Sequence, residues 1–599
     1  MDGAQPDWDM EAFFPGVESG EFLGFRDGLR RELAELLERL RALPALTAAS
    51  LEDWTQALLA LEALGQRAGH LQTYLSCRRA ADSSDSAVAR ETAAMGKPLS
   101  LLQKMSVTVQ QALARASEAE FKALANAPEL RDVRYFLERA RTRAGFSMEQ
   151  ALEDLAAELA VDGINAWGRL YGQLSGVLEF ELNVAGQPPR RVPVSMARTL
   201  MEDPDRAVRE AAFEGSNGAW RGAADTVAAC LNAISGTRLS LYPRRGVVHF
   251  LDPALFDACI ERRTLETLLD VVRSRQELAR RYLRRKAELL GLERLAFYDV
   301  SAPLPGTQGA RIDWGQARER VSRAFGDFHP ELGALSESAF TERWIDHQPR
   351  ASKRPGGFCA SAPLLGQSRI FMTFNGAEGD LSTLAHELGH AFHGRVMDDM
   401  RPWQRRYPMT LAETASTFAE QVVTEAALAA PGLDANGRRA ILDQRLAAAA
   451  TFLCNIPMRF DFEHALYERR AAGELTVDEL QTLVLEAQRK NYGDALDPEG
   501  LDPMFWASKL HFYITSLSFY NFPYTFGYLF SLGIFARARR EGAGFFPIYQ
   551  ELLRKTGSGS AEEVAASVLG VDLQEPEFWN QSIDLIEADL ERFVALAEE

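Results

Sequence analysis

The sequence is poor in cysteine and has no excess of basic residues. Its five cysteines among 599 residues are odd in number and far apart, and none forms a CxxC pair. This pattern argues against a disulfide framework or a cysteine metal site and predicts reduced thiols in a cytoplasm. The formal net charge is −18 at pH 7, from 66 basic and 84 acidic residues. Nucleic acid is therefore not an expected partner, because binding to phosphates requires a basic face.

A secretory signal and a membrane helix are not expected either. The first residues, MDGAQPDWDMEAFFPG, are acidic and contain neither a positive n-region nor a continuous apolar run. The stretch 510–536 has no Asp, Glu, Lys or Arg and is long enough to span a bilayer. It also contains His511, Asn521, Pro523 and two glycines, which disfavour insertion into lipid. We therefore expect a cytoplasmic protein without membrane contact.

Helical periodicity dominates the chain and predicts a mainly α fold. Leucines recur at helical spacing in 25–43, 51–64 and 150–160. Alternation around a Gly-Gln-Pro-Pro turn predicts a hairpin at 177–195, and a second short β region is expected at 357–374. A chain of this length is expected to form two or more lobes. We place the boundary near residue 200, between an N-terminal helical lobe (1–200) that ends in the hairpin and a C-terminal lobe (201–599).

Three of the nine histidines lie within the stretch LAHELGHAFHG, residues 384–394. Turn and cap residues at 379–382 predict a helix from about Leu381 through Met397. His386 and His390 are four apart, so one helix face presents both imidazoles to a single ion. Glu387 lies beside this face. The resulting HExxH pattern is typical of zinc sites in which the glutamate takes a proton from water at the metal.

A third metal ligand is expected from a second helix that begins near residue 410. Glu413 and Glu420 are seven apart and share a face of this helix. Glu413 would complete a two-histidine, one-glutamate zinc site. Glu420 could orient a ligand histidine, and the alternative is a solvated or capping glutamate. His393 is turned partly away from the His386/His390 pair, so it is expected either to support a ligand or to pack in the core. The metzincin pattern is excluded, because it requires glycine and histidine where this chain has His393 and Val396.

These residues resemble the M3 family of zinc peptidases, most closely its oligoendopeptidase F branch. The resemblance rests on His386-Glu387-Leu388-Gly389-His390-Ala391-Phe392-His393-Gly394 followed by 412–420, and on the aromatic segment 519–528. It implies a two-lobed helical metallopeptidase that encloses a deep channel, with a small β region beside the HExxH helix. It also implies one Zn²⁺ per chain at the channel floor and, as substrates, short unstructured peptides cut at internal bonds.

The resemblance assigns His386, His390 and Glu413 as zinc ligands and Glu387 as the general base. Other groups must stabilise the oxyanion of the tetrahedral intermediate.

The aromatic segment supplies candidates for that role and for binding the substrate. Tyr520 and Tyr524 are four apart, and Tyr528 extends the same line on an expected helix. The family analogy favours Tyr524 as the oxyanion donor, with His511 as a further catalytic residue and Tyr520 and Tyr528 as substrate contacts. Core packing is the alternative for Tyr524, Tyr528 and His511.

The β region before the metal helix offers one more candidate. Gly357 would let the substrate backbone approach an extended edge closely. In contrast, Glu463 and His464 have no second histidine at ligand spacing, so they are expected to belong to a packing helix.

Two other functions remain open at this point. A helical zinc carboxypeptidase could use the same HExxH motif, although it would need a cationic clamp for the free C-terminus. A non-catalytic peptide-binding protein could keep the fold, although such a protein has no chemical reason to retain Glu387. The sequence does not indicate the oligomeric state.

Overall fold

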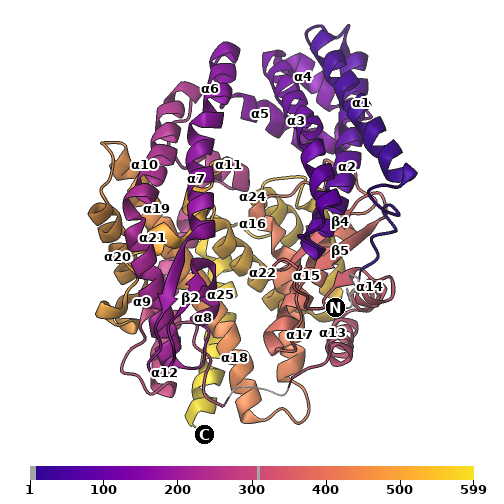
Figure 1. Ribbon diagram of the computed structural model, residues 1–599. Coiled ribbons are helices and arrows are strands. Elements are labelled where there is room, and N and C mark those ends of the chain that lie inside the picture. The colour runs from indigo at the N-terminus through magenta and orange to yellow at the C-terminus, as the bar shows by residue number, and fades with distance from the viewer. Residues whose placement is uncertain (1–7, 307–310, 599) are drawn as a thin grey trace. The chain divides into compact units, whose positions relative to one another are not determined.

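The computed structural model describes residues 8–306 and 311–598, and it confirms a mainly helical fold (Figure 1). The chain divides into two compact units. The first comprises the described parts of Met1–Phe146, Ala310–Ala429 and Ile534–Val571, and the second those of Ser147–Gly309, Ala430–Gly533 and Asp572–Glu599. Each unit contains segments from both sides of residue 200. The predicted lobes, 1–200 and 201–599, are not the same divisions as these units, and they stay a prediction.

The first unit combines a helical bundle with a small sheet and the predicted metal helix. Its helices are α1 (Gly20–Ala42), α2 (Leu51–Ala81), α3 (Ser86–Arg115), α4 (Glu118–Ala125), α5 (Arg134–Ala144), α13 (Trp314–Phe328), α14 (Pro330–Thr341), α15 (Glu378–Val396), α16 (Met409–Ala412), α17 (Thr414–Leu428), α23 (Phe546–Lys555) and α24 (Ala561–Val564). Its strands are β3 (Ile345–Asp346), β4 (Phe358–Ala362) and β5 (Gln367–Phe371).

The amphipathic pattern of 25–43 forms α1 as expected. The Ser19 hydroxyl accepts a hydrogen bond of 3.1 Å from the backbone N–H of Phe22 and caps the first turn. Leu29, Leu33 and Leu40 recur at helical spacing and are buried. The apolar face packs against α2 and α3, which lie beside α1 in Figure 1. The helices predicted at 51–64 and 150–160 are also present, as α2 and α6 (Gln150–Asp162).

The β region predicted at 357–374 contains β4 and β5, which join the unpredicted strand β3 in a three-stranded sheet with the order β3-β5-β4. Strands β4 and β5 pair antiparallel, with Phe358 opposite Phe371, whereas β3 pairs parallel to β5. Both β4 and β5 contact α15, and Figure 1 shows α15 between this sheet and α17. The sheet therefore supports the helix that carries the HExxH motif.

The second unit contains the predicted hairpin and most of the remaining helices. The hairpin pairs β1 (Glu179–Leu182) antiparallel with β2 (Arg190–Pro193), which confirms the turn between them. The helices are α6, α7 (Ile164–Val177), α8 (Ala197–Leu200), α9 (Arg206–Gly222), α10 (Ala224–Leu241), α11 (Asp252–Ala258), α12 (Arg262–Leu289), α18 (Ala435–Ala450), α19 (Ile456–Arg470), α20 (Val477–Tyr492), α21 (Phe505–Ser508), α22 (Phe522–Glu541, up to Gly533) and α25 (Pro576–Glu598).

The uncharged stretch 510–536 is not one continuous helix. It begins with a 3₁₀ turn, Leu510–Tyr513, and α22 starts only at Phe522. Tyr520 therefore precedes the helix that carries Tyr524 and Tyr528, contrary to the expectation that one helix holds all three phenols. Phe519 has a φ of 54°, a left-handed value that interrupts helical geometry before α22. Within residues 8–306 and 311–598, every helix is too short or too polar to cross a bilayer.

Candidate metal centre

Helix α15 begins three residues earlier than the sequence predicts. Its first residue is Glu378 rather than Leu381, because Asp380 closes the first turn. The Asp380 carboxylate accepts hydrogen bonds from the backbone N–H groups of Asn375, at 2.7 Å, and Ala377, at 3.0 Å. These bonds cap the first turn of α15. Within the helix, the spacing of four residues places His386 and His390 on one face.

A glycine of the HExxH motif allows α17 to pack directly on α15. A Cβ atom added at Gly389 would lie 2.5 Å from the carbonyl oxygen of Ala415 and 2.7 Å from Cα of Ser416. Because the contacted atoms belong to the backbone, any larger residue would force the two helices apart. The close approach brings the beginning of α17 to the histidine face of α15.

Three possible ligand atoms converge between these helices. Nε2 of His386 lies 3.2 Å from Nε2 of His390, and Oε2 of Glu413 lies 3.4 Å and 3.5 Å from these two atoms. Four tetrahedral ligands about 2.0–2.1 Å from zinc would be separated by about 3.3–3.4 Å. The triangle formed by the three donors therefore fits a tetrahedral zinc site with one position left for water or substrate.

Glu413 lies at a break in the predicted second helix. It follows the last residue of α16 and directly precedes α17 as its N-cap, and both Glu413 and Glu420 contact His386. The Ser416 hydroxyl donates a hydrogen bond of 2.7 Å to Oε2 of Glu413 and orients the carboxylate. Glu413 reaches His386 and His390 from the junction between α16 and α17, whereas Glu420 contacts His386 from within α17.

Glu420 holds His386 in the tautomer that a metal requires. Nδ1 of His386 donates a hydrogen bond of 2.6 Å to Oε1 of Glu420, and the Ser382 hydroxyl donates one of 3.1 Å to Oε2. A proton on Nδ1 leaves the lone pair of Nε2 directed at the donor triangle. Burial lowers the pKa of His386, but the hydrogen bond to Glu420 and the nearby glutamates raise it to about 9. A metal ion would compete with this second proton.

Glu387 does not belong to the donor triangle and is buried beside it. Its side chain is 5% exposed, and Oε2 has no hydrogen-bond partner among the described residues. Burial, reinforced by the charges of Glu413 and Glu420, outweighs His386 and raises the pKa of Glu387 to about 7. Such a carboxyl group can accept and return a proton near neutral pH.

The edge of β4 closes the space next to Glu387. A Cβ atom added at Gly357 would lie 3.3 Å from Oε1 of Glu387 and 3.4 Å from Cγ2 of Thr383. The glycine backbone thus lies directly against the carboxylate. The contact places Gly357 at the site, and its assignment to substrate binding stays a prediction.

The third histidine of the cluster packs in the core, one of the two roles expected for it. His393 is fully buried, and its Nε2 lies 2.9 Å from Oγ1 of Thr556 and 3.3 Å from the carbonyl oxygen of Leu553. Its ring stacks on Tyr407, with 4.2 Å between the centroids. The imidazole of His393 is therefore engaged by Thr556, Leu553 and Tyr407 and does not belong to the donor triangle.

In the second unit, His511 lies with two of the predicted tyrosines. Its ring centroid is 4.9 Å from that of Tyr520 and 6.4 Å from that of Tyr524, and the Tyr524 hydroxyl donates a hydrogen bond of 3.1 Å to the Tyr520 hydroxyl. Tyr528 is buried and stacks on Phe452, with 4.2 Å between the centroids. The catalytic and substrate roles of these four residues stay predictions.

Hydrogen bonds also determine the tautomer of His511. Arg459 Nη1, which can only donate, lies 3.0 Å from the side-chain oxygen of Asn521. The same oxygen lies 2.7 Å from Nδ1 of His511, so Nδ1 must carry a proton. Burial lowers the pKa of His511 despite the bond to Asn521. The neutral ring therefore presents Nε2 as a hydrogen-bond acceptor.

Glu463 has a role that sequence reasoning did not find. Its buried carboxylate accepts a hydrogen bond of 2.8 Å from the backbone N–H of Phe519, the residue with the left-handed backbone directly before Tyr520. Burial raises the pKa of Glu463 to about 7. The one available signal was a glutamate within the largely apolar face of the predicted helix.

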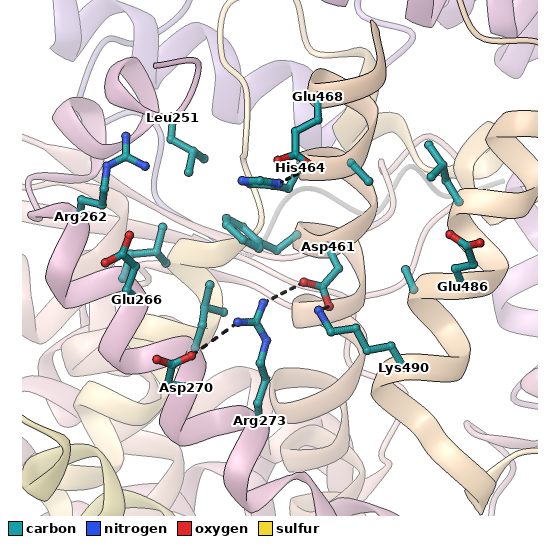
Figure 2. A pocket seen from close by; sticks show the side chains of 16 residues that line it. Leu251, Arg262, Glu266, Asp270, Arg273, Asp461, His464, Glu468, Glu486 and Lys490 are labelled. Carbon is teal, nitrogen blue, oxygen red and sulfur yellow. Dashed lines mark hydrogen bonds and ion pairs between the residues drawn. The ribbon is translucent and has the colours of Figure 1, made fainter. Parts of the chain in front are cut away.

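His464, the neighbour of Glu463, lines a separate pocket of about 600 Å³ between α12, α19 and α20 (Figure 2). Its Nδ1 lies 3.5 Å from a carboxylate oxygen of Glu468. About one turn earlier on the same helix, Asp461 pairs with Arg273 and Lys490, at 2.8 Å and 3.1 Å. Opposite charges thus neutralise each other along this wall.

Two family models match the chain. The model described as Peptidase family M3 matches residues 199–585, and the model described as Oligopeptidase F matches residues 113–180. The first match covers the HExxH motif, Glu413, Glu420 and the aromatic segment.

Curated relatives include a Group B oligopeptidase PepB from Streptococcus agalactiae, which is 26% identical over 89% of this chain and 88% of the relative. An oligoendopeptidase F homolog from Lactococcus lactis subsp. lactis is 26% identical over 67% of this chain. The match spans 66% of the length of the Lactococcus protein.

Solved structures share the fold over nearly the full length. A protein from Chlamydophila abortus aligns with a TM-score of 0.82 and 20% identity, covering 99% of both chains. The crystal structure of oligoendopeptidase-F from Enterococcus faecium aligns with a TM-score of 0.72 and 20% identity, covering 96% of this chain and 98% of that one. At this level of identity, the alignments establish the fold alone.

Proposed function

The chain belongs to peptidase family M3, in its oligoendopeptidase F branch, and from this membership we propose that it is a zinc-dependent endopeptidase. Its substrates in this proposal are short oligopeptides, cut at internal peptide bonds. The observation that carries the proposal is the convergence of His386, His390 and Glu413 beside the buried carboxyl group of Glu387. Two imidazoles and one carboxylate form a ligand set typical of catalytic zinc.

The residues of the donor triangle would hold one Zn²⁺ ion, with Glu420 orienting His386. When bound, zinc supplies Lewis acidity that polarises the scissile carbonyl and acidifies water. Glu387 would accept the proton of the attacking water and return it to the leaving amine. The raised pKa of Glu387 suits both transfers, because general acid–base groups are most effective when their pKa lies near the working pH.

The family resemblance suggests the remaining polar contacts to the substrate. Tyr524, a hydroxyl donor, is the proposed partner of the developing oxyanion. His511 would accept a hydrogen bond through Nε2, for example from a peptide N–H, because its Nδ1 proton is committed to Asn521. Tyr520 and Tyr528 are further proposed substrate contacts, and Gly357 is proposed to offer backbone groups.

The proposal also includes a reducing, cytoplasmic environment without nucleic-acid or membrane partners. The five cysteines are free thiols, four of them buried, which suits a compartment where disulfides do not form. The net charge of −18 disfavours nucleic acid as a partner, because binding to phosphates requires a basic face.

Mass-spectrometric mapping of products from a defined peptide mixture tests this function. The zinc-loaded protein, the protein with a chelator and the Glu387→Gln variant would be compared. We expect internal cuts that both the chelator and the substitution abolish. Stepwise loss of C-terminal residues would support the carboxypeptidase alternative instead, and metal binding without any cleavage would support the peptide-binding alternative.

A further inference from the structure

Two cationic side chains of the second unit lie together beside the proposed substrate residues. Arg459 extends from α19, and Lys509 lies between α21 and the 3₁₀ turn that carries His511. Both lie over the ring of Phe505, at 5.6 Å and 5.1 Å from its centroid. Both side chains are half-buried, and Arg459 Nη1 lies 3.4 Å from Nδ1 of His511.

Neither cation has an acidic partner among the described residues. Across the parts of the chain that the structure describes, no carboxylate oxygen lies within 4.0 Å of Arg459 or Lys509. Asp502 interacts electrostatically with Lys509, but it is buried and its carboxylate accepts a hydrogen bond of 2.9 Å from the backbone N–H of Met504. The cations in the pocket of Figure 2 differ, because Arg273 and Lys490 share Asp461.

The electrostatic environment reflects this missing countercharge. Burial and the positive charges of Arg459 and Arg198 lower the pKa of Lys509 to about 7. Burial also lowers the pKa of Arg459 to about 10. A nearby negative charge would stabilise both cations, since half-buried charges are unfavourable without a partner.

Hydrogen-bond donors remain available for such an anion. Arg459 uses Nε to bond Asn455, at 2.8 Å, and Nη1 to bond Asn521, at 3.0 Å. Its Nη2 group and the ammonium group of Lys509 make no hydrogen bond to any described residue. The side-chain nitrogen of Asn521, a residue that is 1% exposed, also lacks a partner within the described chain.

We infer that Arg459 and Lys509 form a binding site for a carboxylate group of the peptide substrate. A guanidinium and an ammonium group that both lie over one aromatic ring can each donate charge-assisted hydrogen bonds to a carboxylate. The inference rests on the proposed function, which makes peptides the ligands of this region. The carboxylate can belong to the C-terminus or to an acidic side chain. In either case the site selects substrates by charge.

Three versions of one cleavable peptide test the site and distinguish the two sources of the carboxylate. One has a free C-terminus, one has a C-terminal amide, and one is an amide whose last residue is glutamate. We expect kcat/KM for the free acid to exceed that for the plain amide by about tenfold or more. High activity on the glutamate amide would assign the carboxylate to a side chain, and low activity would assign it to the terminus.

The Lys509→Met variant is expected to bring the ratio of acid to amide activity close to one. Lys490→Met is the matched control, because it removes a lysine of the same unit whose partner is Asp461; it should keep the ratio. Equal kcat/KM for all three peptides, or an unchanged ratio in Lys509→Met, would overturn the inference.

Binding of the same peptides to Glu387→Gln, measured by fluorescence anisotropy, separates this inference from the proposed function. A preference for the acid in binding would support the carboxylate site even if no peptide is hydrolysed. Efficient cleavage of acid and amide alike, with equal affinities, would overturn the carboxylate site and leave the endopeptidase proposal intact.

Discussion

Nδ1 of His386 donates a hydrogen bond of 2.6 Å to Oε1 of Glu420. The bond holds the imidazole in one tautomer and orientation, and the negative charge makes Nε2 a better metal ligand. Glu420→Gln is expected to lower the affinity for zinc by about 10- to 100-fold. Competition with a chromophoric chelator measures this affinity. Glu425→Gln removes a charge from the same helix and should leave it unchanged; equal affinities in both variants would contradict the role of Glu420.

The contact between Gly357 and Glu387 predicts sensitivity to a single methyl group. Gly357→Ala would place Cβ 3.3 Å from Oε1 of Glu387, so the carboxylate must shift. A displaced general base is expected to lower kcat by about tenfold or more without unfolding the protein. In the control Gly394→Ala, the new Cβ would lie 3.8 Å from Oγ of Ser368, an ordinary contact. A Gly357→Ala variant with wild-type kcat would show that the carboxylate tolerates the shift.

Glu463 predicts a pH-dependent stability. Burial raises its pKa in the folded protein from 4.5 to about 7, so folding favours the protonated form. The associated stability is present below pH 4.5 and is lost as the pH rises through 7. Glu463→Gln imitates the protonated form and keeps an acceptor for Phe519. It should match the wild type at low pH and be more stable by about 1–3 kcal/mol at pH 8.

Thermal unfolding at a series of pH values measures the difference between the Glu463→Gln variant and the wild type. Glu468→Gln changes the charge of the same helix at an exposed position and serves as the control. A constant difference between Glu463→Gln and the wild type across the pH range would contradict the assigned burial effect.

The helix that carries the HExxH motif was predictable because its signals, residue spacing and cap residues, lie close together in the sequence. Histidines four residues apart on a helix must share a face, and cap residues reveal where that helix begins. The amphipathic helices and the hairpin followed from periodicity for the same reason. Glu413 was found as a candidate, but the junction between α16 and α17 at which it lies was not, because no glycine or proline marks it in the sequence.

The surroundings of His511 depend on contacts between distant parts of the sequence. Arg459 reaches Asn521 across 62 positions, and Glu463 reaches Phe519 across 56. No periodicity or spacing rule encodes such pairs. The left-handed backbone of Phe519 is equally hidden, since phenylalanine rarely adopts it without tertiary support. Sequence reasoning therefore extended α22 through Tyr520 and assigned Glu463 to packing.

The most direct test of the central claim measures metal content and peptide cleavage together in the wild type and in Glu387→Gln. We predict one zinc ion per chain in both proteins, because Glu387 lies outside the donor triangle of His386, His390 and Glu413. Cleavage of an internal peptide bond should fall by about 10²- to 10⁴-fold in the variant. A variant that binds zinc and cleaves at the wild-type rate would contradict the assignment of Glu387 as the general base.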